Sequence, residues 1–270
     1  MYTSMINAVS GMRSAQLKMD SIGNNVANTN THGYKAQEVS FGSVLAQQYK
    51  VTPEEPSKEG RLTPLHLRVG MGALANLHRY NMHPGAPVQT DVETDLYIQG
   101  RAFFQVQGEN GEPHLTRLGA FQPMNNGDGR MVLGTADGRR VLDANQETIE
   151  IPDGYRVQVN ERGIINYVEI SNPNNQIEAG IQLSLVTVPN RQALVQVGEN
   201  LYATPEGVEV EQVGNTGEVL VKQGFLEGSN VDLAKEMSTL IEVQRHFQFN
   251  SRALQLIDEM GQTINNIYGR

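Results

Sequence analysis

The chain carries the stretch S-I-G-N-N-V-A-N-T-N-T-H-G-Y-K at residues 21–35, which closes an N-terminal helix. Ser, Asn and Thr side chains bond to nearby backbone groups and so compete with helical hydrogen bonds. Their crowding after Ile22 therefore predicts that the helix ends here. Gly33 can then adopt the left-handed conformation that redirects the chain.

The helix before this turn carries a heptad repeat of apolar residues. One row steps by seven residues, a second row runs beside it, and together they comprise Met5, Met12, Met19, Val26, Ala8, Ala15 and Ile22. Such rows form the seam of a coiled coil, although a single amphipathic helix packed on its own domain has the same repeat. Because Tyr2, Ile6, Val9 and Leu17 lie off the seam, we expect this helix to have more than one neighbour.

A second long helix is predicted at the C-terminus. Its apolar stripe steps by four and three residues through Leu233, Met237, Leu240, Gln244 and Phe247, and it continues through Ala253, Ile257, Met260, Ile264 and Ile267, with Leu254 in the heptad row of Phe247. Ser229 and Asp232 have the spacing of a capping box that would begin it. At 1.5 Å per residue this helix is about 55 Å long, and the N-terminal one about 37 Å. Both are too long to be covered by one small β domain.

The sequence between the helices reads as β structure. Tyr155, Val157 and Val159 alternate with polar residues before N-E-R-G at 160–163, which predicts a hairpin. The run T-P-E-E-P-S-K-E-G at 52–60 predicts an extended connector or exposed loop. The fold class is therefore mixed but mainly β. Its expected parts are an N-terminal helix with its turn (1–35), a connector (36–69), an all-β domain (70–227) and a C-terminal helix (228–270).

Composition restricts the possible partners. With 270 residues and 39% hydrophobic content, the chain can bury one good core plus outlying elements, or two small domains. A formal net charge of -9 without a Lys/Arg run argues against nucleic acid. The absence of Cys removes disulfides, zinc–thiolate sites and thiol nucleophiles. Neither a cleavable signal at residues 1–9 nor an apolar run long enough to span a bilayer is visible, so no membrane insertion is expected.

One acidic group could suggest catalysis. Asp91, Glu93 and Asp95 would project from one face of a strand and could hold a metal ion or share acid–base work. No second acidic cluster accompanies them, and the six His lack helical metal spacing, so an exposed strand face is the favoured interpretation. We therefore expect no cofactor and no enzyme activity. A β-rich extracellular enzyme or carbohydrate binder that uses this face is the remote alternative.

The stretch at 21–35 resembles the signature of bacterial flagellar rod and hook proteins, in which Asn-Asn-x-Ala-Asn is followed by Thr-x-Gly, an aromatic residue and Lys. The matching positions are Asn24, Asn25, Ala27, Asn28, Thr31, Gly33, Tyr34 and Lys35. Further segments similar to this family are T-D-L-Y-I-Q-G at 94–100, T-R-L-G at 116–119 and Q-G-F-L-E-G-S-N-V at 223–231. The chain departs from the pattern at Gly23, where many relatives carry Ser, and at Arg101-Ala102, where Asp-Gly is usual.

The resemblance implies an all-β domain inserted between terminal helices that pair as an antiparallel coiled coil. It implies a structural subunit of the flagellar basal-body rod in the cell envelope, with the distal rod favoured, that serves torque transmission and encloses an export channel. Such subunits leave through the flagellar type III apparatus without a cleaved signal. The implied partners are copies of the chain, neighbouring rod and hook proteins, a rod cap and the export apparatus. A proximal rod or hook subunit is the nearer alternative.

Overall fold

A computed structural model of the chain describes residues 2–43, 46–50, 66–70, 72–108, 111–126, 129–171, 176–198, 200–205, 207–213 and 219–268. It divides into two compact units. The helical unit consists of Met1–Ala27, Gln37–Arg79 and Asp232–Arg270, and the β unit consists of Asn28–Ala36 and Tyr80–Val231. The chain therefore passes between the units four times. The proline-rich run at 52–60 lies outside the described residues.

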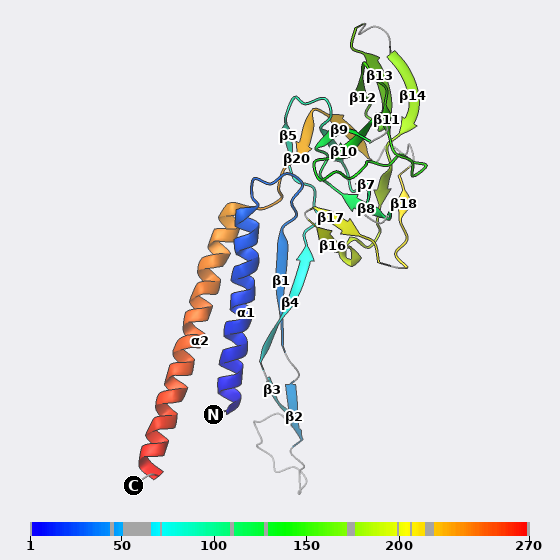
Figure 1. Cartoon of the computed structure of the whole chain (residues 1–270). Coiled ribbons are helices and arrows are strands. Elements are labelled where there is room, and N and C mark those ends of the chain that lie inside the picture. Colours follow the sequence, from blue (N-terminus) through cyan, green and yellow to red (C-terminus); the bar gives the residue numbers. More distant parts are fainter. Residues whose placement is uncertain are drawn as a thin grey trace. The chain divides into compact units, whose positions relative to one another are not determined.

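The helical unit contains two long helices and a β ribbon. Helix α1 (Tyr2–Ala27) and helix α2 (Leu233–Tyr268) run side by side in opposite directions (Figure 1). Strand β1 (Gln37–Ser43) pairs with β4 (Ala73–Tyr80) alongside α1, and β2 (Ala46–Lys50) pairs with β3 (His66–Gly70). The prediction of terminal helices that flank a β-rich region and pack against each other is confirmed. Neither helix, over its described length, is apolar enough to cross a membrane.

The two helices pack through small and aliphatic side chains. Ala15, Ile22 and Val243 form a buried cluster, and Met19, Val26, Leu240 and Phe247 pack against it. Further toward the N-terminus, a Cβ at Gly11 would lie 2.8 Å from Asn250 Nδ2, so the helices are close here. Apolar residues at intervals of three and four give each helix one such stripe.

Helix α2 begins differently from the prediction. Asp232 Oδ1 accepts hydrogen bonds from the backbone N–H groups of Ala234 at 3.0 Å and Lys235 at 3.2 Å, so Asp232 is the cap residue. The predicted capping box that begins at Ser229 is wrong, because the Ser229 hydroxyl accepts instead from the N–H of Val231 at 3.4 Å. At the other boundary, Gly33 has a φ of +74°, which confirms the predicted left-handed turn after α1.

The β unit is built from short antiparallel strands. Its largest sheet has the order β16 (Val195–Gly198), β17 (Leu201–Ala203), β8 (Pro113–Thr116), β7 (Phe103–Gln107), β15 (Leu185–Thr187) and β18 (Glu211–Gln212). Two smaller sheets have the orders β11 (Glu150–Ile151), β10 (Met131–Thr135), β9 (Phe121–Asn125), and β12 (Tyr155–Val159), β13 (Ile164–Glu169), β14 (Gln176–Gln182). Two strand pairs join β5 (Pro87–Gln89) to β20 (Phe225–Glu227), and β6 (Leu96–Gln99) to β19 (Leu220–Gln223). A short 3-10 helix, η1, spans Arg191–Ala193.

Strand β7 lies at the centre of this unit and is buried on both faces. Phe104 belongs to the main core and packs edge to face on Phe121, with ring centroids 5.1 Å apart. Phe103 belongs to a second core cluster with Leu115 and Tyr202. Successive strand residues point to opposite faces, so this one strand connects two cores. The predicted hairpin is confirmed by β12 and β13, in which Val159 pairs with Ile165.

Candidate functional site

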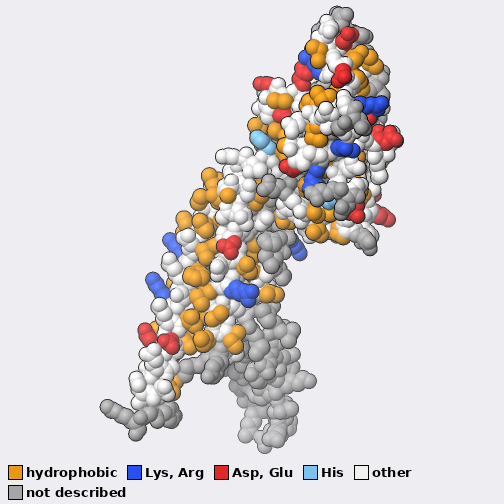
Figure 2. All heavy atoms as spheres, viewed as in Figure 1, with side chains coloured by type: hydrophobic (Ala, Val, Ile, Leu, Met, Phe, Trp, Pro, Cys, Tyr) orange, Lys and Arg blue, Asp and Glu red, His pale blue; other side chains and the backbone are white. Residues whose placement is uncertain are grey.

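The paired helices leave many apolar side chains exposed (Figure 2). The large apolar side chains exposed on α1 are Met5, Ile6 and Val9, and those exposed on α2 are Leu233, Met237, Ile241, Phe249, Leu256, Met260, Ile264 and Ile267. We call this set the helix surface. Isolated apolar residues are normal on protein surfaces, but α2 exposes them along its length at intervals of three, four, seven and eight residues, which is typical of a helix face that another protein covers.

The sequence-predicted seam residues fall into two groups. Leu240 and Phe247 pack against the buried helix cluster, and Leu254 and Ile257 are half-buried. Leu233 and Met237 are exposed and belong to the helix surface. Sequence reasoning missed Val243, which is buried, and placed the exposed Gln244 in the stripe instead. The spacing Leu240, Val243, Phe247 could have identified it, because three-residue and four-residue steps alternate along one helix face.

Asn25 of the signature holds three elements of the helical unit together. Its carboxamide Nδ2 donates to Gln37 O at 3.0 Å and to Glu236 Oε1 at 3.1 Å, while Gln37 N donates to Asn25 Oδ1 at 2.8 Å. The side chain therefore contacts α1, β1 and α2 at once, and it is buried. Its neighbours Asn24 and Ala27 are exposed on the last turns of α1.

Asn25 ends a polar stripe on α1 that binds the β ribbon. The side chains of this stripe are Ser10, Ser14, Lys18, Ser21 and Asn25. Ser14 Oγ donates to Ala73 O at 3.3 Å, Lys18 Nζ donates to Val39 O at 3.1 Å, and Ser21 Oγ donates to Gln37 O at 3.1 Å. Every one of these ribbon partners is a backbone atom. The stripe was not predicted from the sequence, although its steps of four and three residues indicate one helix face.

The rest of the signature forms a turn in the β unit. Thr31 Oγ1 donates to Asn28 Oδ1 at 3.1 Å, and the Thr31 N–H donates to Asn28 O at 3.2 Å. The N–H of Gly33 donates to Glu227 O at 2.7 Å, and Tyr34 is buried. A Cβ at Gly33 would lie 3.1 Å from both the Cα and the N of Leu118, so the turn fits tightly against that segment.

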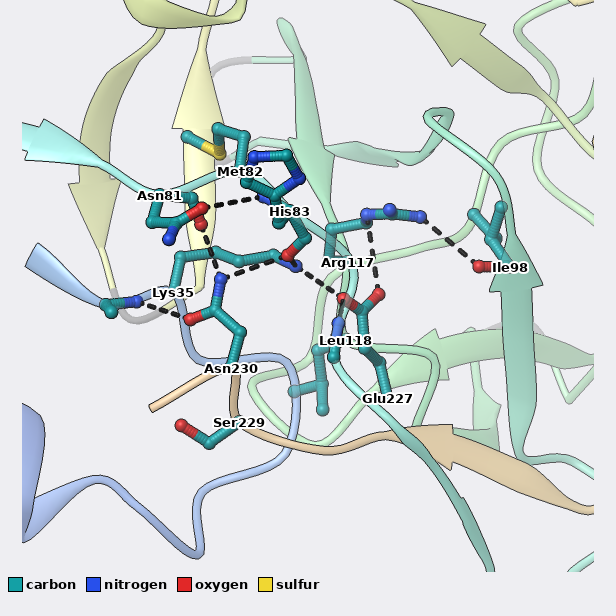
Figure 3. A network of polar contacts seen from close by, with 12 residues as sticks. Lys35, Asn81, Met82, His83, Ile98, Arg117, Leu118, Glu227, Ser229 and Asn230 are labelled. Atoms are coloured by element: carbon teal, nitrogen blue, oxygen red, sulfur yellow. Dashed lines mark hydrogen bonds and ion pairs between the residues drawn. The ribbon is translucent and has the colours of Figure 1, made fainter. Parts of the chain in front are cut away.

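Lys35 ends the signature in a buried ionic network (Figure 3). Its ammonium donates to Glu227 Oε1 and, at 2.8 Å, to His83 O. The second oxygen of Glu227 lies 3.4 Å from Arg117 Nε, an ion pair without hydrogen-bond geometry. The three residues Lys35, Glu227 and Arg117 are only 1%, 2% and 2% exposed. Charges this deeply buried must be paired, which explains why the side chains converge.

Asn230 adds a second, uncharged layer beside the ion pair. Its Oδ1 accepts from the N–H of Ala36 at 2.8 Å, and its Nδ2 donates to Asn81 O at 2.6 Å and to His83 O at 3.0 Å. The N–H of Asn81 in turn donates to Ala36 O at 2.8 Å. We call Lys35, Asn81, Arg117, Glu227 and Asn230 together the hub.

The hub buries two cations against one carboxylate. Burial lowers the pKa of the Lys35 ammonium to about 8, although Glu227 opposes the shift, and the nearby Arg117 lowers it further. Burial likewise lowers the pKa of Arg117, again opposed by Glu227. Both cations are therefore less favourable here than in water. Removing Glu227 would leave them without their carboxylate partner.

The three carboxylates proposed as one strand face have separate partners. Asp91 has a φ of +57° and lies in the turn between β5 and β6, where its carboxylate accepts from Gln89 Nε2 at 2.6 Å. Glu93 forms an exposed ion pair with Arg156 at 2.9 Å, and Asp95 accepts from Thr90 Oγ1 at 2.6 Å. The strand-face interpretation is wrong, because the chain turns here. Throughout the described residues, no group of His, Asp and Glu side chains could hold a metal ion.

Three segments of the chain match known protein families. Residues 5–35 match a flagella basal body rod protein model, residues 97–167 match the flagellar hook protein FlgE/F/G D1 domain, and residues 222–267 match the flagellar basal body rod FlgEFG protein C-terminal model. The chain is also 32% identical to the flagellar basal-body rod protein FlgG of Bacillus subtilis, with 99% of each chain covered. It belongs to the bacterial flagellar basal-body rod family.

Other relatives agree with this assignment. The FlgG rod protein of Borreliella burgdorferi is 32% identical, with 99% of each chain covered. The flagellar hook-basal body complex protein FlhP of Bacillus subtilis is 31% identical over 99% of this chain and 100% of FlhP.

The hub joins the three matched segments of this rod-family chain. Lys35 lies in the first segment, Arg117 in the second and Glu227 in the third. Sequence analysis noted all three residues within family motifs but did not predict that they meet. No local signal indicates such a meeting, because each motif contributes only one charge.

Proposed function

We propose that this chain is a structural, non-catalytic subunit of the bacterial flagellar basal-body rod, in its distal part. The observation that carries the proposal is the helix surface, which stays exposed after α1 and α2 have packed together. Similarity to rod proteins along the whole chain supports the same function. The chain is a component of the flagellar basal body.

Assembly would bury the helix surface of each copy against its neighbours. Full burial of one Leu, Ile, Met or Phe side chain contributes roughly 1.5 to 3 kcal/mol, so a few residues suffice to drive association. Contacts between different faces of identical subunits produce an open helical filament when the rotation does not close. Such a filament would transmit torque and enclose a channel for exported proteins. Its partners would be copies of the chain, adjoining rod and hook proteins, the rod cap and the export apparatus.

We also propose a role for each part of the chain. Helices α1 and α2, within the predicted parts 1–35 and 228–270, would carry assembly. The predicted connector at 36–69 would support them, because Gln37–Arg79 lies in the helical unit, and the part of the predicted β domain 70–227 that follows Arg79 would form the β unit. The signature residues Asn25 and Lys35 would hold these parts in place through the contacts described above. Export would proceed through the flagellar type III apparatus without cleavage of the N-terminus.

The test is a bacterium whose own copy of this gene is deleted. We expect basal bodies purified from it to lack a complete rod and a hook, and the native chain to restore both. A peptide tag inserted at Asp137, in an exposed turn, would locate the subunit by electron microscopy of labelled basal bodies. Complete rods and hooks in the deletion strain would contradict the proposal.

The similarity to FlhP keeps a second position open within the same assembly. A proximal rod or hook subunit would carry the same helices and the same exposed surface. The tag distinguishes these cases, because label near the base of the rod indicates a proximal subunit and label beyond the rod indicates a hook subunit. Label on the upper rod supports the distal assignment.

A further inference from the structure

We infer that the hub is a mechanical coupling. It holds together the β-unit segments at which the chain enters and leaves that unit, so that force from the helical unit reaches the β unit through one rigid group of residues. The inference rests on the proposed rod function, because only a load-bearing subunit requires such a coupling. It assigns a positioning role to Glu227 and Asn230 that assembly through the helices does not itself require.

Several hub residues lie next to the crossings along the chain. The chain passes between the two units after Ala27, Ala36, Arg79 and Val231. At three of these crossings, the nearby β-unit residues are Ala36, Asn81 and Asn230, and hydrogen bonds connect them in a closed triangle. Without these bonds, each crossing could move separately from the others.

Glu227 provides a second set of bonds between the same three segments. Its Oε1 accepts from Lys35 Nζ and from the Gly85 N–H, the latter at 2.8 Å, and Lys35 also donates to His83 O. The backbone O of Glu227 accepts from Gly33 N, which fixes the turn that follows the first crossing. At all four crossings, therefore, the adjoining β-unit segment carries or is bonded to the Glu227 carboxylate or the Asn230 side chain.

Close backbone contact tightens this arrangement. The N–H of Gly228 donates to Ala86 O at 2.9 Å. A Cβ built at Gly85 would lie 2.0 Å from Gly228 O, so the two segments approach each other closely here. Since no side chain separates them, a shift of one segment must move the other.

Arg117 connects the hub to the core of the β unit. Its guanidinium donates to Gly100 O at 2.7 Å and to Ile98 O at 3.4 Å, at the end of β6. The same group lies 5.4 Å from the ring centroid of Phe103 on β7, the strand between the two cores. Force that reaches Glu227 is thus passed to the centre of the sheet.

The chemistry of the hub also favours a positioning role. Replacing a buried ion pair with apolar groups often leaves stability unchanged or raises it, so net stability alone does not explain this one. Hydrogen bonds between charged groups instead fix distance and direction, whereas apolar contacts can slide. A coupling that transmits torque needs contacts whose direction is fixed.

The experiment uses the full chain in solution. Because the native sequence contains no Cys, spin labels attach only to Cys residues that are introduced. We introduce Asp137→Cys in the β unit and Gln255→Cys on α2, both at exposed positions, and attach spin labels. The distribution of distances between them is measured by electron paramagnetic resonance in the native background and in Glu227→Gln and Asn230→Ala. Glu93→Gln is the matched control, because it neutralises a carboxylate in an exposed ion pair.

We expect Asn230→Ala and Glu227→Gln to widen the distribution roughly twofold while the circular dichroism spectrum stays native, as hinge freedom would require. Glu93→Gln should leave the width unchanged. If Glu227→Gln unfolds, Asn230→Ala decides, because it changes no charge. An unchanged width in a folded Asn230→Ala protein overturns the inference.

A second measurement separates this inference from the proposed function. In the deletion strain, the Asn230→Ala chain should restore rods, hooks and filaments but reduce swimming speed as medium viscosity is raised. Failure of the native chain to restore rods would contradict the rod function itself. Native swimming of Asn230→Ala at every viscosity would overturn the coupling alone.

Discussion

Asn25 and Gln37 are joined by two hydrogen bonds of opposite direction, so that one side-chain carboxamide satisfies both backbone groups of a strand residue. The same carboxamide binds Glu236 at the start of α2. One signature residue thus fixes where β1 begins relative to both helices. This explains in physical terms why an amide is needed here, since it alone offers a donor and an acceptor side by side.

Replacing Asn25 with Ala should therefore loosen β1. The change leaves the N–H of Gln37 without this partner, while its C=O keeps the hydrogen bond from Ser21, and we expect a loss of roughly 1 to 3 kcal/mol in local stability. Hydrogen exchange of the β1 amides measures it. Asn265→Ala, at an exposed position on α2, is the control and should change nothing. Equal protection of β1 in the two variants would show that the Asn25 contacts do not hold the strand.

Lys35 should make the free energy of unfolding rise with pH in the alkaline range. Burial lowers its native pKa to about 8, whereas the unfolded amine keeps the ordinary value of 10.5. Between pH 8 and pH 10 the unfolded chain binds more protons, so the free energy of unfolding rises with pH, by roughly 2 kcal/mol from this group. Urea unfolding at several pH values should show a rise that Lys35→Met lacks. Parallel profiles of the two proteins would mean that Lys35 titrates normally.

Two nearby phenylalanines should respond in opposite ways. Phe247 packs against the buried helix cluster, so Phe247→Ala should destabilise the helical unit by roughly 3 kcal/mol. Phe249 is 63% exposed, so Phe249→Ala should leave the melting temperature of the monomer unchanged. In cells, Phe249→Ala should nevertheless reduce the number of completed rods. Normal rod completion with Phe249→Ala would remove this residue from the proposed assembly surface.

Two glycines of the signature region make another matched pair. Gly33 has a φ of +74°, and a Cβ there would press on the backbone of Leu118, so Gly33→Ala should destabilise by roughly 1 to 3 kcal/mol. Gly23 lies within α1, where a Cβ would meet no described atom within 4 Å. Gly23→Ala should stabilise by up to about 1 kcal/mol. Thermal unfolding should shift in opposite directions, and a lower melting temperature for both would refute the argument.

Much of the architecture was predictable because it follows from the local periodicity of apolar residues in the sequence. The rows through Ile22 and Phe247 predicted two helices that bury part of their surface against each other, and alternation around Val157 predicted a hairpin. Spacing alone did not identify which apolar residues stay exposed. Leu233 and Met237 have the same spacing as Leu240, yet only Leu240 packs against the buried cluster.

The sequence by itself determined the two helices, the β character between them and, through its motifs, the family. Only the tertiary structure decided that Lys35, Arg117 and Glu227 meet, that Asp232 rather than Ser229 caps α2, and that Asp91, Glu93 and Asp95 separate in a turn. Helices and strands follow from contacts between residues a few positions apart, which a repeat records. The partner of a buried charge depends on the path of the whole chain, and no repeat records that path.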